Sequence, residues 1–169
     1  MSERKKTMRL LKDKEGKEAE QWMLRAADTA SHALCTRAKC GSIIVKDGEV
    51  IGAGYNAPPL NAEENRMCGA TYMYGKPKYD ATCCMHAEWR AILDALKANP
   101  ERIYGSALYF VRIDNDGVVK RSGKPYCTVC SRFALDAGIA TFALWHAEGV
   151  GEYPTEEYNK LSYEYRHTA

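Results

Sequence analysis

The chain has 169 residues, a length typical of one domain whose hydrophobic core needs no disulfide or metal for support. Its 24 basic and 22 acidic residues leave a formal net charge of +2, whereas a protein that lives on nucleic acid usually carries a larger basic excess. The longest nearly apolar run, AGIATFALW, is far too short to span a bilayer. We therefore expect a single domain over residues 1–169 and no membrane, and the charge balance gives no indication of a nucleic-acid partner.

The chain contains seven cysteines at irregular spacing, and an odd number of this kind makes a poor disulfide framework. The opening segment MSERKKTMRL is basic but has no apolar stretch behind it, so it does not resemble a signal peptide. Both observations favour a cytoplasmic protein. In a reducing cytosol, clustered cysteines more often bind metal or take part in chemistry.

The first half of the chain predicts a helix, a hairpin and a long loop. Residues 1–16 are highly charged, and we expect them to form a loose, partly helical arm. Apolar residues at helical spacing then predict a helix from about Lys17 to Leu34. The segment GSIIVKDGEVIGAGYN predicts a hairpin that turns at Asp47-Gly48. Residues 57–84 are rich in Gly, Pro and Asn, and so long a loop within a compact domain is usually functional or disordered.

Helices and strands alternate in the second half. Helices are predicted from Ala87 to about Lys97 and from Thr128 to Ala137, and each precedes a strand-like segment, SALYFVRI or IATFALW. The segment YPTEEYNKLSYEY closes the chain as a further helix. This alternation implies parallel strands joined by helical crossovers. We expect an α/β fold, a three-layer α/β/α sandwich with a mixed central sheet of about five strands.

Two short motifs carry the candidate chemistry. His86 and Glu88 form a His-x-Glu motif at the start of one predicted helix, and Cys127 and Cys130 form a Cys-x-x-Cys motif at the start of the next. The positive end of a helix dipole favours the thiolate form of cysteine, which is the form that binds zinc. Three protein ligands leave one position open for water, as in catalytic zinc sites. The pattern predicts Zn²⁺ held by His86, Cys127 and Cys130.

Glu88 lies two residues from His86, so its carboxylate can stand beside the metal without binding it. Zinc lowers the pKa of a bound water to about 7, and a carboxylate in this position can take up the proton and pass it on. Such a set suits hydrolysis at an electrophilic carbon. Each motif alone has a plainer interpretation: a solvated helix start, a redox pair, a structural zinc knuckle or packing cysteines. Together, each ahead of a helix and with one strand between them, they are far more specific.

The sequence resembles the cytidine deaminase-like superfamily. His-x-Glu followed by Pro-Cys-x-x-Cys is the signature of zinc deaminases, and CTRAKCGSIIVKDGEVIGAGYNAPP is similar to the corresponding stretch of deoxycytidylate (dCMP) deaminases. The resemblance covers about Ala26 to Trp145. It implies the cytidine deaminase-like fold and a zinc hydrolase that acts on an amidine C–N bond. His86, Cys127 and Cys130 would be the ligands and Glu88 the catalytic acid and base.

The resemblance also implies substrate contacts. Asn56 matches a residue that holds the substrate sugar, and Ala87 matches the position whose backbone faces the base. Tyr153 falls near a tyrosine that contacts the base or sugar in some relatives. A phosphate on the substrate needs cationic or backbone N–H partners. The segments expected near the pocket contain the basic residues Arg37, Lys39, Arg90 and Arg132.

Further cysteines indicate a second metal. Cys35, Cys68 and Cys84, or its neighbour Cys83, match cysteines that hold a structural zinc in some bacterial and phage dCMP deaminases. Such a site would fix the long loop, whereas Cys35 at the end of an amphipathic helix is equally suited to packing in the core. The resemblance further implies a homo-oligomer. Tyrosines near the end of the chain would supply interface contacts or pack on their own sheet.

Three features depart from the family pattern. Tyr126 separates Pro125 from Cys127, Arg90 stands where these deaminases usually have Asn, and residues 113–124 lengthen the connection between the central strand and the second zinc motif. These changes leave the reaction type intact and bear on the substrate.

The leading hypothesis is hydrolytic deamination of a cytosine nucleotide, with dCMP converted to dUMP and ammonia released. One alternative keeps the chemistry and changes the substrate to another nucleoside, a purine base or adenosine in tRNA, although a tRNA enzyme should show a basic face. A second alternative is a non-catalytic zinc-binding module, which would have no use for Glu88.

Overall fold

A computed structural model of the chain describes residues 7–67, 83–121 and 123–165. Six strands form one sheet in the order β1-β6-β5-β4-β2-β3. The strands are β1 (Arg9–Leu10), β2 (Lys39–Lys46), β3 (Glu49–Tyr55), β4 (Ala107–Ile113), β5 (Thr141–His146) and β6 (Gly149–Pro154). The helices are α1 (Asp13–Ala30), α2 (Ala87–Ala98), α3 (Thr128–Asp136) and α4 (Thr155–Glu164), with the short 3₁₀ turns η1 (Pro59–Asn61) and η2 (Glu63–Asn65).

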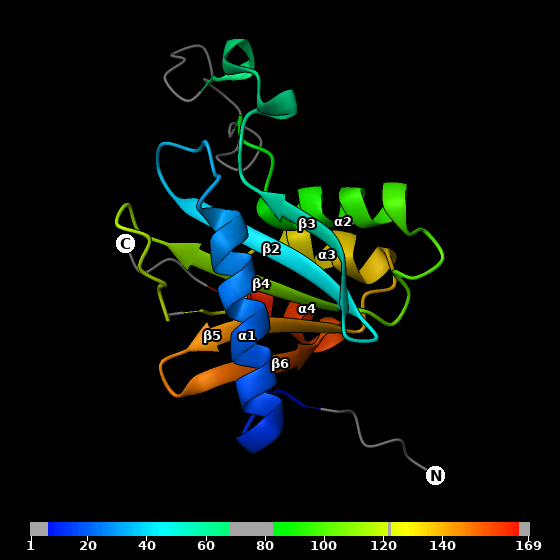
Figure 1. Cartoon of the computed structure of the whole chain (residues 1–169). Coiled ribbons are helices and arrows are strands. Elements are labelled where there is room, and N and C mark those ends of the chain that lie inside the picture. The colour runs from blue at the N-terminus through cyan, green and yellow to red at the C-terminus, as the bar shows by residue number, and fades with distance from the viewer. Residues whose placement is uncertain (1–6, 68–82, 122, 166–169) are drawn as a thin grey trace.

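The sheet lies between two helical layers (Figure 1). Helix α1 covers one face, where Met23 and Ala26 pack against Ile43 and Val111 of the strands. Helices α2, α3 and α4 cover the other face, whose core contains apolar side chains from all three helices and from strands β2 to β6. The predicted three-layer α/β/α sandwich is therefore confirmed. None of the helices in the described ranges is long and apolar enough to cross a membrane.

The sheet is mixed, as predicted. β4 and β5 pair in parallel through the crossover helix α3, and the other neighbouring strands pair antiparallel. Because parallel strands end at the same edge of a sheet, the carboxyl ends of β4 and β5 lie together, and ligands commonly bind at such an edge.

The predicted arm is not loose over residues 9–16, which are ordered, although its last residues are helical as expected. Arg9 and Leu10 pair with β6, and the helix begins at Asp13, four residues before the expected start. The Arg9 guanidinium contacts Glu15 at 2.8 Å and Glu152 at 3.1 Å, and Leu11 is buried in the core under α1. One buried leucine and one bridging arginine thus fix a segment whose composition alone indicated a solvated tail.

Strand β6 was not predicted. Its sequence GVGEYP contains two glycines and a glutamate, so it lacks the run of branched and aromatic residues that indicates a strand. It pairs antiparallel with β5 over its full length, from His146 with Gly149 to Thr141 with Pro154. A neighbouring strand, rather than local propensity, determines this element.

Helix α2 lies directly against β3 because two glycines leave room for it. A Cβ atom on Gly52 would stand 2.5 Å from the Ala91 carbonyl oxygen. A Cβ atom on Gly54 would stand 2.4 Å from the Ala91 nitrogen and 2.5 Å from the Ala87 carbonyl oxygen. No real Cβ tolerates such distances, so the two glycines fix the first turn of α2, which carries the His-x-Glu motif, against the end of β3.

Side chains of the α2 region also bond to the outer edge of β3, which is the last strand of the sheet. The Asp94 carboxylate accepts a hydrogen bond from the Ala53 N–H at 2.9 Å. The Asn99 amide, directly after the helix, donates to the Ile51 carbonyl at 2.9 Å. Helix α2 and the residue after it therefore contact β3 both on the face of the sheet and along the outer edge of the strand.

Candidate active site

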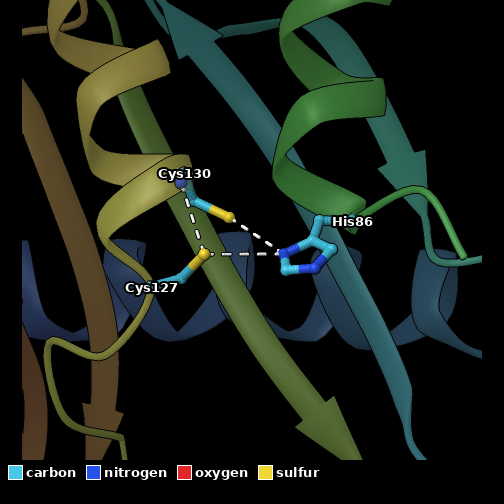
Figure 2. A group of neighbouring side chains, drawn as sticks. All are labelled: His86, Cys127 and Cys130. Atoms are coloured by element: carbon cyan, nitrogen blue, oxygen red, sulfur yellow. Dashed lines mark hydrogen bonds between the residues drawn. The ribbon is translucent and has the colours of Figure 1, made fainter. Parts of the chain in front are cut away.

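The two predicted zinc motifs meet at the first turns of α2 and α3, on the face of the sheet that these helices cover (Figure 2). The Nδ1 atom of His86 lies 3.2 Å from the Cys130 sulfur and 3.6 Å from the Cys127 sulfur. Within the described ranges, these three residues form the one group of His, Cys, Asp or Glu side chains whose ligand atoms all lie within 4.8 Å of one another. Cys130 is fully buried, and the other two are half-buried.

The spacing of these atoms fits a tetrahedral zinc site. With zinc–nitrogen bonds of about 2.0–2.1 Å and zinc–sulfur bonds of about 2.3 Å, tetrahedral geometry separates a nitrogen and a sulfur ligand by about 3.6 Å. The observed His86 distances of 3.2 and 3.6 Å therefore need little adjustment. Two thiols and an imidazole also form the donor set that zinc prefers, and they leave a fourth position open.

The local chain prepares one thiolate. Cys127 is the N-cap of α3, and its sulfur accepts a hydrogen bond from the Cys130 N–H at 3.3 Å. The hydrogen bond from the Cys130 thiol, together with those from His86 and the Cys130 N–H, outweighs burial and lowers the pKa of Cys127 to about 4. Burial and the neighbouring Cys127 charge raise the pKa of Cys130 well above its usual value. The pair therefore carries one negative charge, and metal binding would displace the proton of the second thiol.

Glu88 occupies the second position of α2 and is 5% exposed. Burial raises the pKa of its carboxyl group to about 7, although the charge of His86 and hydrogen bonds from its own N–H and the Cys130 thiol oppose the shift. A carboxyl group of this kind can both accept and donate a proton near neutral pH, which is the property expected of a general acid and base. The sequence placed Glu88 beside the metal ligands, and the structure agrees.

A cavity of about 580 Å³ opens over these residues, at the carboxyl ends of β4 and β5. Of the substrate contacts expected from sequence, Asn56 and Ala87 line the cavity together with His86, Glu88 and Cys127. The cavity lies where the parallel pair of strands ends, so the fold and the metal motifs indicate the same place.

Asn56 is held firmly at the wall of this cavity. Its Oδ1 atom accepts from the Cys40 N–H at 2.9 Å, and its Nδ2 atom donates to the Ala38 carbonyl at 2.8 Å. The side chain is 8% exposed. The amide still has a second hydrogen to donate, so Asn56 is suited to donate one hydrogen bond to a ligand.

Tyr153 lies away from the cavity. Its ring packs in the core at 6.0 Å from the Tyr158 ring, and its hydroxyl group is 2.8 Å from Nε2 of His146. Two other tyrosines line the cavity instead: the ring of Tyr126, the residue inserted before Cys127, meets the ring of Tyr165 edge-on at 4.9 Å. The inserted residue could be recognised in the sequence as a change in the wall, but nothing there indicated its contact with Tyr165.

Arg90 also lies outside the cavity. Its Nη1 atom donates to the Tyr55 carbonyl at 3.1 Å, its Nη2 atom donates to Oδ1 of Asn61 at 2.8 Å, and its guanidinium group stacks 5.0 Å from the centre of the Tyr55 ring. It joins the end of β3 to turn η1. This departure from the family pattern therefore concerns the scaffold. Arg37, Lys39 and Arg132, the other cations expected near the pocket, do not line the cavity either.

The cysteines of the predicted second metal site come together in part. Cys35 and Cys84 both line the cavity, and their thiols are hydrogen-bonded. Burial alone would raise the pKa of Cys35. Hydrogen bonds from the N–H groups of Arg37 and Ala38 and from the Cys84 thiol outweigh this effect, so the net shift of the pKa is downward. Cys68 lies outside the described residues.

Comparison with known proteins identifies the family. A family model described as the cytidine and deoxycytidylate deaminase zinc-binding region matches residues 16–145, well over half of the chain. The chain belongs to this deaminase family. It is 31% identical to the deoxycytidylate deaminase of Mycobacterium phage D29 over 121 residues, which cover 68% of this chain and 83% of the relative.

Solved structures show the same fold. The crystal structure of dCMP deaminase from the cyanophage S-TIM5 in complex with dCMP and dUMP is 25% identical, with a TM-score of 0.53 and coverage of 78% of this chain and 82% of that one. The 1.6 Å crystal structure of cytidine deaminase from Burkholderia pseudomallei is 18% identical, with a TM-score of 0.55 and coverage of 82% and 94%. The predicted family and fold are thus confirmed, and the protein is a deaminase-family enzyme with a His/Cys zinc site.

Proposed function

We propose that this enzyme hydrolytically deaminates a cytosine nucleotide, with dCMP converted to dUMP and ammonia. The observation that carries the proposal is the buried Glu88 carboxyl group beside the ligand set His86, Cys127 and Cys130, at the base of a cavity. A structural zinc site would prefer a fourth protein ligand and would gain nothing from a buried acid.

The residues of the site divide the work of deamination. His86, Cys127 and Cys130 would hold zinc, which when bound would supply a nucleophilic water at neutral pH. Glu88 accepts a proton from that water and delivers it to N3 of the cytosine ring as C4 is attacked. It then carries the second proton to the departing amine, so that ammonia leaves and the carbonyl of uracil forms. The raised pKa of Glu88, about 7, suits both directions of transfer.

Other residues orient the substrate. The backbone at Ala87 faces the base, and the remaining amide hydrogen of Asn56 donates to the sugar. Both residues line the cavity, and hydrogen bonds to the backbone of Cys40 and Ala38 anchor the Asn56 side chain. The names of the phage D29 relative and of the cyanophage enzyme with its bound dCMP and dUMP support a deoxycytidine monophosphate substrate.

An ammonia-release screen tests this function. It covers cytosine, adenine and guanine as base, nucleoside, monophosphate and triphosphate, and dCMP should give the highest kcat/KM. Glu88→Gln should keep zinc and lose about two to four orders of magnitude in rate, whereas Glu101→Gln, at an exposed site, should match the unmodified enzyme. Activity on a purine alone would change the substrate, and zinc binding without ammonia release from any compound would indicate a non-catalytic module.

The active protein is expected to be a cytoplasmic homo-oligomer. Of the four tyrosines near the end of the chain, Tyr153 and Tyr158 are buried, whereas Tyr163 and Tyr165 are exposed at 61% and 38%. Large apolar side chains are also exposed on the outer helices, with Leu93 at 43% on α2 and Phe133 at 39% on α3. Light scattering at micromolar concentration should give a multiple of the 18.9 kDa chain mass.

A further inference from the structure

Three cations gather at the mouth of the active-site cavity. Arg112, Lys120 and Lys124 line it with exposed side chains, and Glu88 is the one acid that lines it within the described ranges. These three side chains form no ion pair or hydrogen bond with any described residue. Unpaired positive charge around a concave site attracts anionic ligands.

The pleat of β4 places Arg112 on the face of the sheet that carries the zinc motifs. Side chains of a strand alternate between faces, so Leu108, Phe110 and Arg112 lie on the same face. Leu108 belongs to the core that contains Ile92 of α2, and this is the face that carries the zinc motifs. Phe110 lines the cavity next in line. Arg112 therefore extends from the end of β4 on the catalytic side of the sheet.

A row of backbone contacts connects these cations to the expected sugar contact. The Asn56 N–H donates to the Cys40 carbonyl at 3.3 Å, and Cys40 pairs with Arg112 across β2 and β4. The Lys120 N–H donates to the Arg112 carbonyl at 2.9 Å. Asn56, Cys40, Arg112 and Lys120 thus lie side by side across the sheet, and all four line the cavity.

Two sets of hydrogen bonds hold the segment that follows β4 against the sheet. The Asp114 carboxylate accepts from the N–H groups of Asp116 and Val118, both at 2.9 Å, and so closes a tight turn. Further on, the Gly123 N–H donates to the Trp145 carbonyl at 3.2 Å, which attaches the segment to β5. The Asp114 carboxylate thus bonds to backbone N–H groups of its own turn and forms no ion pair with Lys120 or Lys124, which line the cavity.

We propose that Arg112 and Lys120, assisted by Lys124, bind the phosphate of the substrate and make the enzyme select a nucleoside monophosphate over the nucleoside. The inference rests on the proposed deaminase function, which places the base at Glu88 and the sugar at Asn56. The phosphate, attached to the sugar, would then lie beside Arg112 and Lys120, next to Asn56 across the sheet. The lengthened connection of residues 113–124 is in this view a specificity element.

The kinetic test compares dCMP with deoxycytidine for Arg112→Gln, Lys120→Gln and the double variant. Charge-assisted hydrogen bonds to phosphate should make the dCMP-to-deoxycytidine ratio of kcat/KM fall by about ten- to a hundred-fold in the double variant. Arg132→Gln removes an exposed cation of α3 that does not line the cavity, and it should keep the ratio of the unmodified enzyme. An unchanged ratio in the double variant, whether both rates persist or both fall together, overturns the proposal.

A binding test separates this proposal from the proposed function. In a zinc-loaded Glu88→Gln background, calorimetry should show tighter binding of dCMP than of deoxycytidine, and the difference should shrink in the Arg112/Lys120 double variant and at high salt. If the unmodified enzyme releases no ammonia from any cytosine compound, the proposed function fails while a phosphate-dependent difference in binding upholds the role of the cations. Equal binding of the two compounds overturns that role whatever the turnover.

Discussion

The imidazole of His86 stacks on the indole of Trp89, one helical turn later, with ring centres 4.0 Å apart and planes within 6° of parallel. The stack fixes the ring orientation that directs Nδ1 toward both sulfur atoms. Trp89→Ala should therefore weaken zinc binding by about tenfold, at the lower end of the range for residues that support a metal ligand. Trp89→Phe keeps an aromatic face and should retain most of the affinity. Competition with a chelator measures the difference, and equal affinity in both variants would show that the stack is incidental.

Zinc removal should expose a reactive thiolate. Because the pKa of Cys127 is lowered to about 4, its thiolate predominates above that pH and is lost only as the pH falls through about 4. In the zinc-free protein, alkylation of Cys127 should proceed at a similar rate from pH 8 to pH 5, and zinc should block it. Cys40, whose pKa burial raises to about 12, serves as the internal control and should remain unmodified. Peptide mapping resolves the two, and a rate at Cys127 that drops tenfold per pH unit below 8 would contradict the lowered pKa.

Gly54→Ala should damage both the fold and the zinc site. The new Cβ would stand 2.4 Å from the Ala91 nitrogen, so the first turn of α2 must move. Overpacking of this kind costs about 1–3 kcal/mol in the free energy of unfolding, and zinc affinity should fall with it because the turn carries His86 and Glu88.

Gly48→Ala is the matched control for that change. Gly48 has a φ of +74° in the β2–β3 turn, where an added Cβ meets nothing within 4 Å. It should cost about 1 kcal/mol through backbone strain and leave zinc affinity unchanged. Denaturant unfolding and chelator competition together distinguish the two variants. Equal zinc affinity in Gly54→Ala and the unmodified protein would show that the α2 turn tolerates the shift.

If the second metal site exists, the protein should contain two zinc ions per chain. Cys35 and Cys84 are hydrogen-bonded thiols in the described part of the chain, and a metal there would replace the shared proton. Metal analysis of Cys84→Ser should then give one zinc per chain, with the deaminase zinc retained. One zinc in the unmodified protein would remove the idea of a second site.

The sequence identified the chemistry well because its signals are local. His86 and Glu88 lie two residues apart, Cys127 and Cys130 lie three apart, and each pair begins a helix whose apolar period is plain. Such spacing places the donor atoms correctly once two helix starts meet. The family and the zinc cofactor followed from these motifs, the fold class followed from the alternation of helices and strands, and all three are confirmed.

The cavity wall was harder to predict because it depends on register between distant segments. Arg112 reaches the site because β4 pairs with β2 in one register, and Lys120 because the following segment folds back onto β4. Tyr165 contacts Tyr126, but the two residues are far apart in the sequence, so no local pattern predicts the contact. Tyr153, chosen by its nearness to an expected position, lies instead in a strand that was not predicted.

The bonds from the α2 region to the edge of β3 limit how copies of this protein can associate. The Ala53 N–H and the Ile51 carbonyl, which would otherwise be free to pair with an incoming strand, are already bonded to Asp94 and Asn99. A second molecule therefore cannot extend the sheet at this end without first displacing those side chains. Edge-to-edge pairing of sheets from different molecules, the usual hazard of an open strand edge, is therefore hindered at β3.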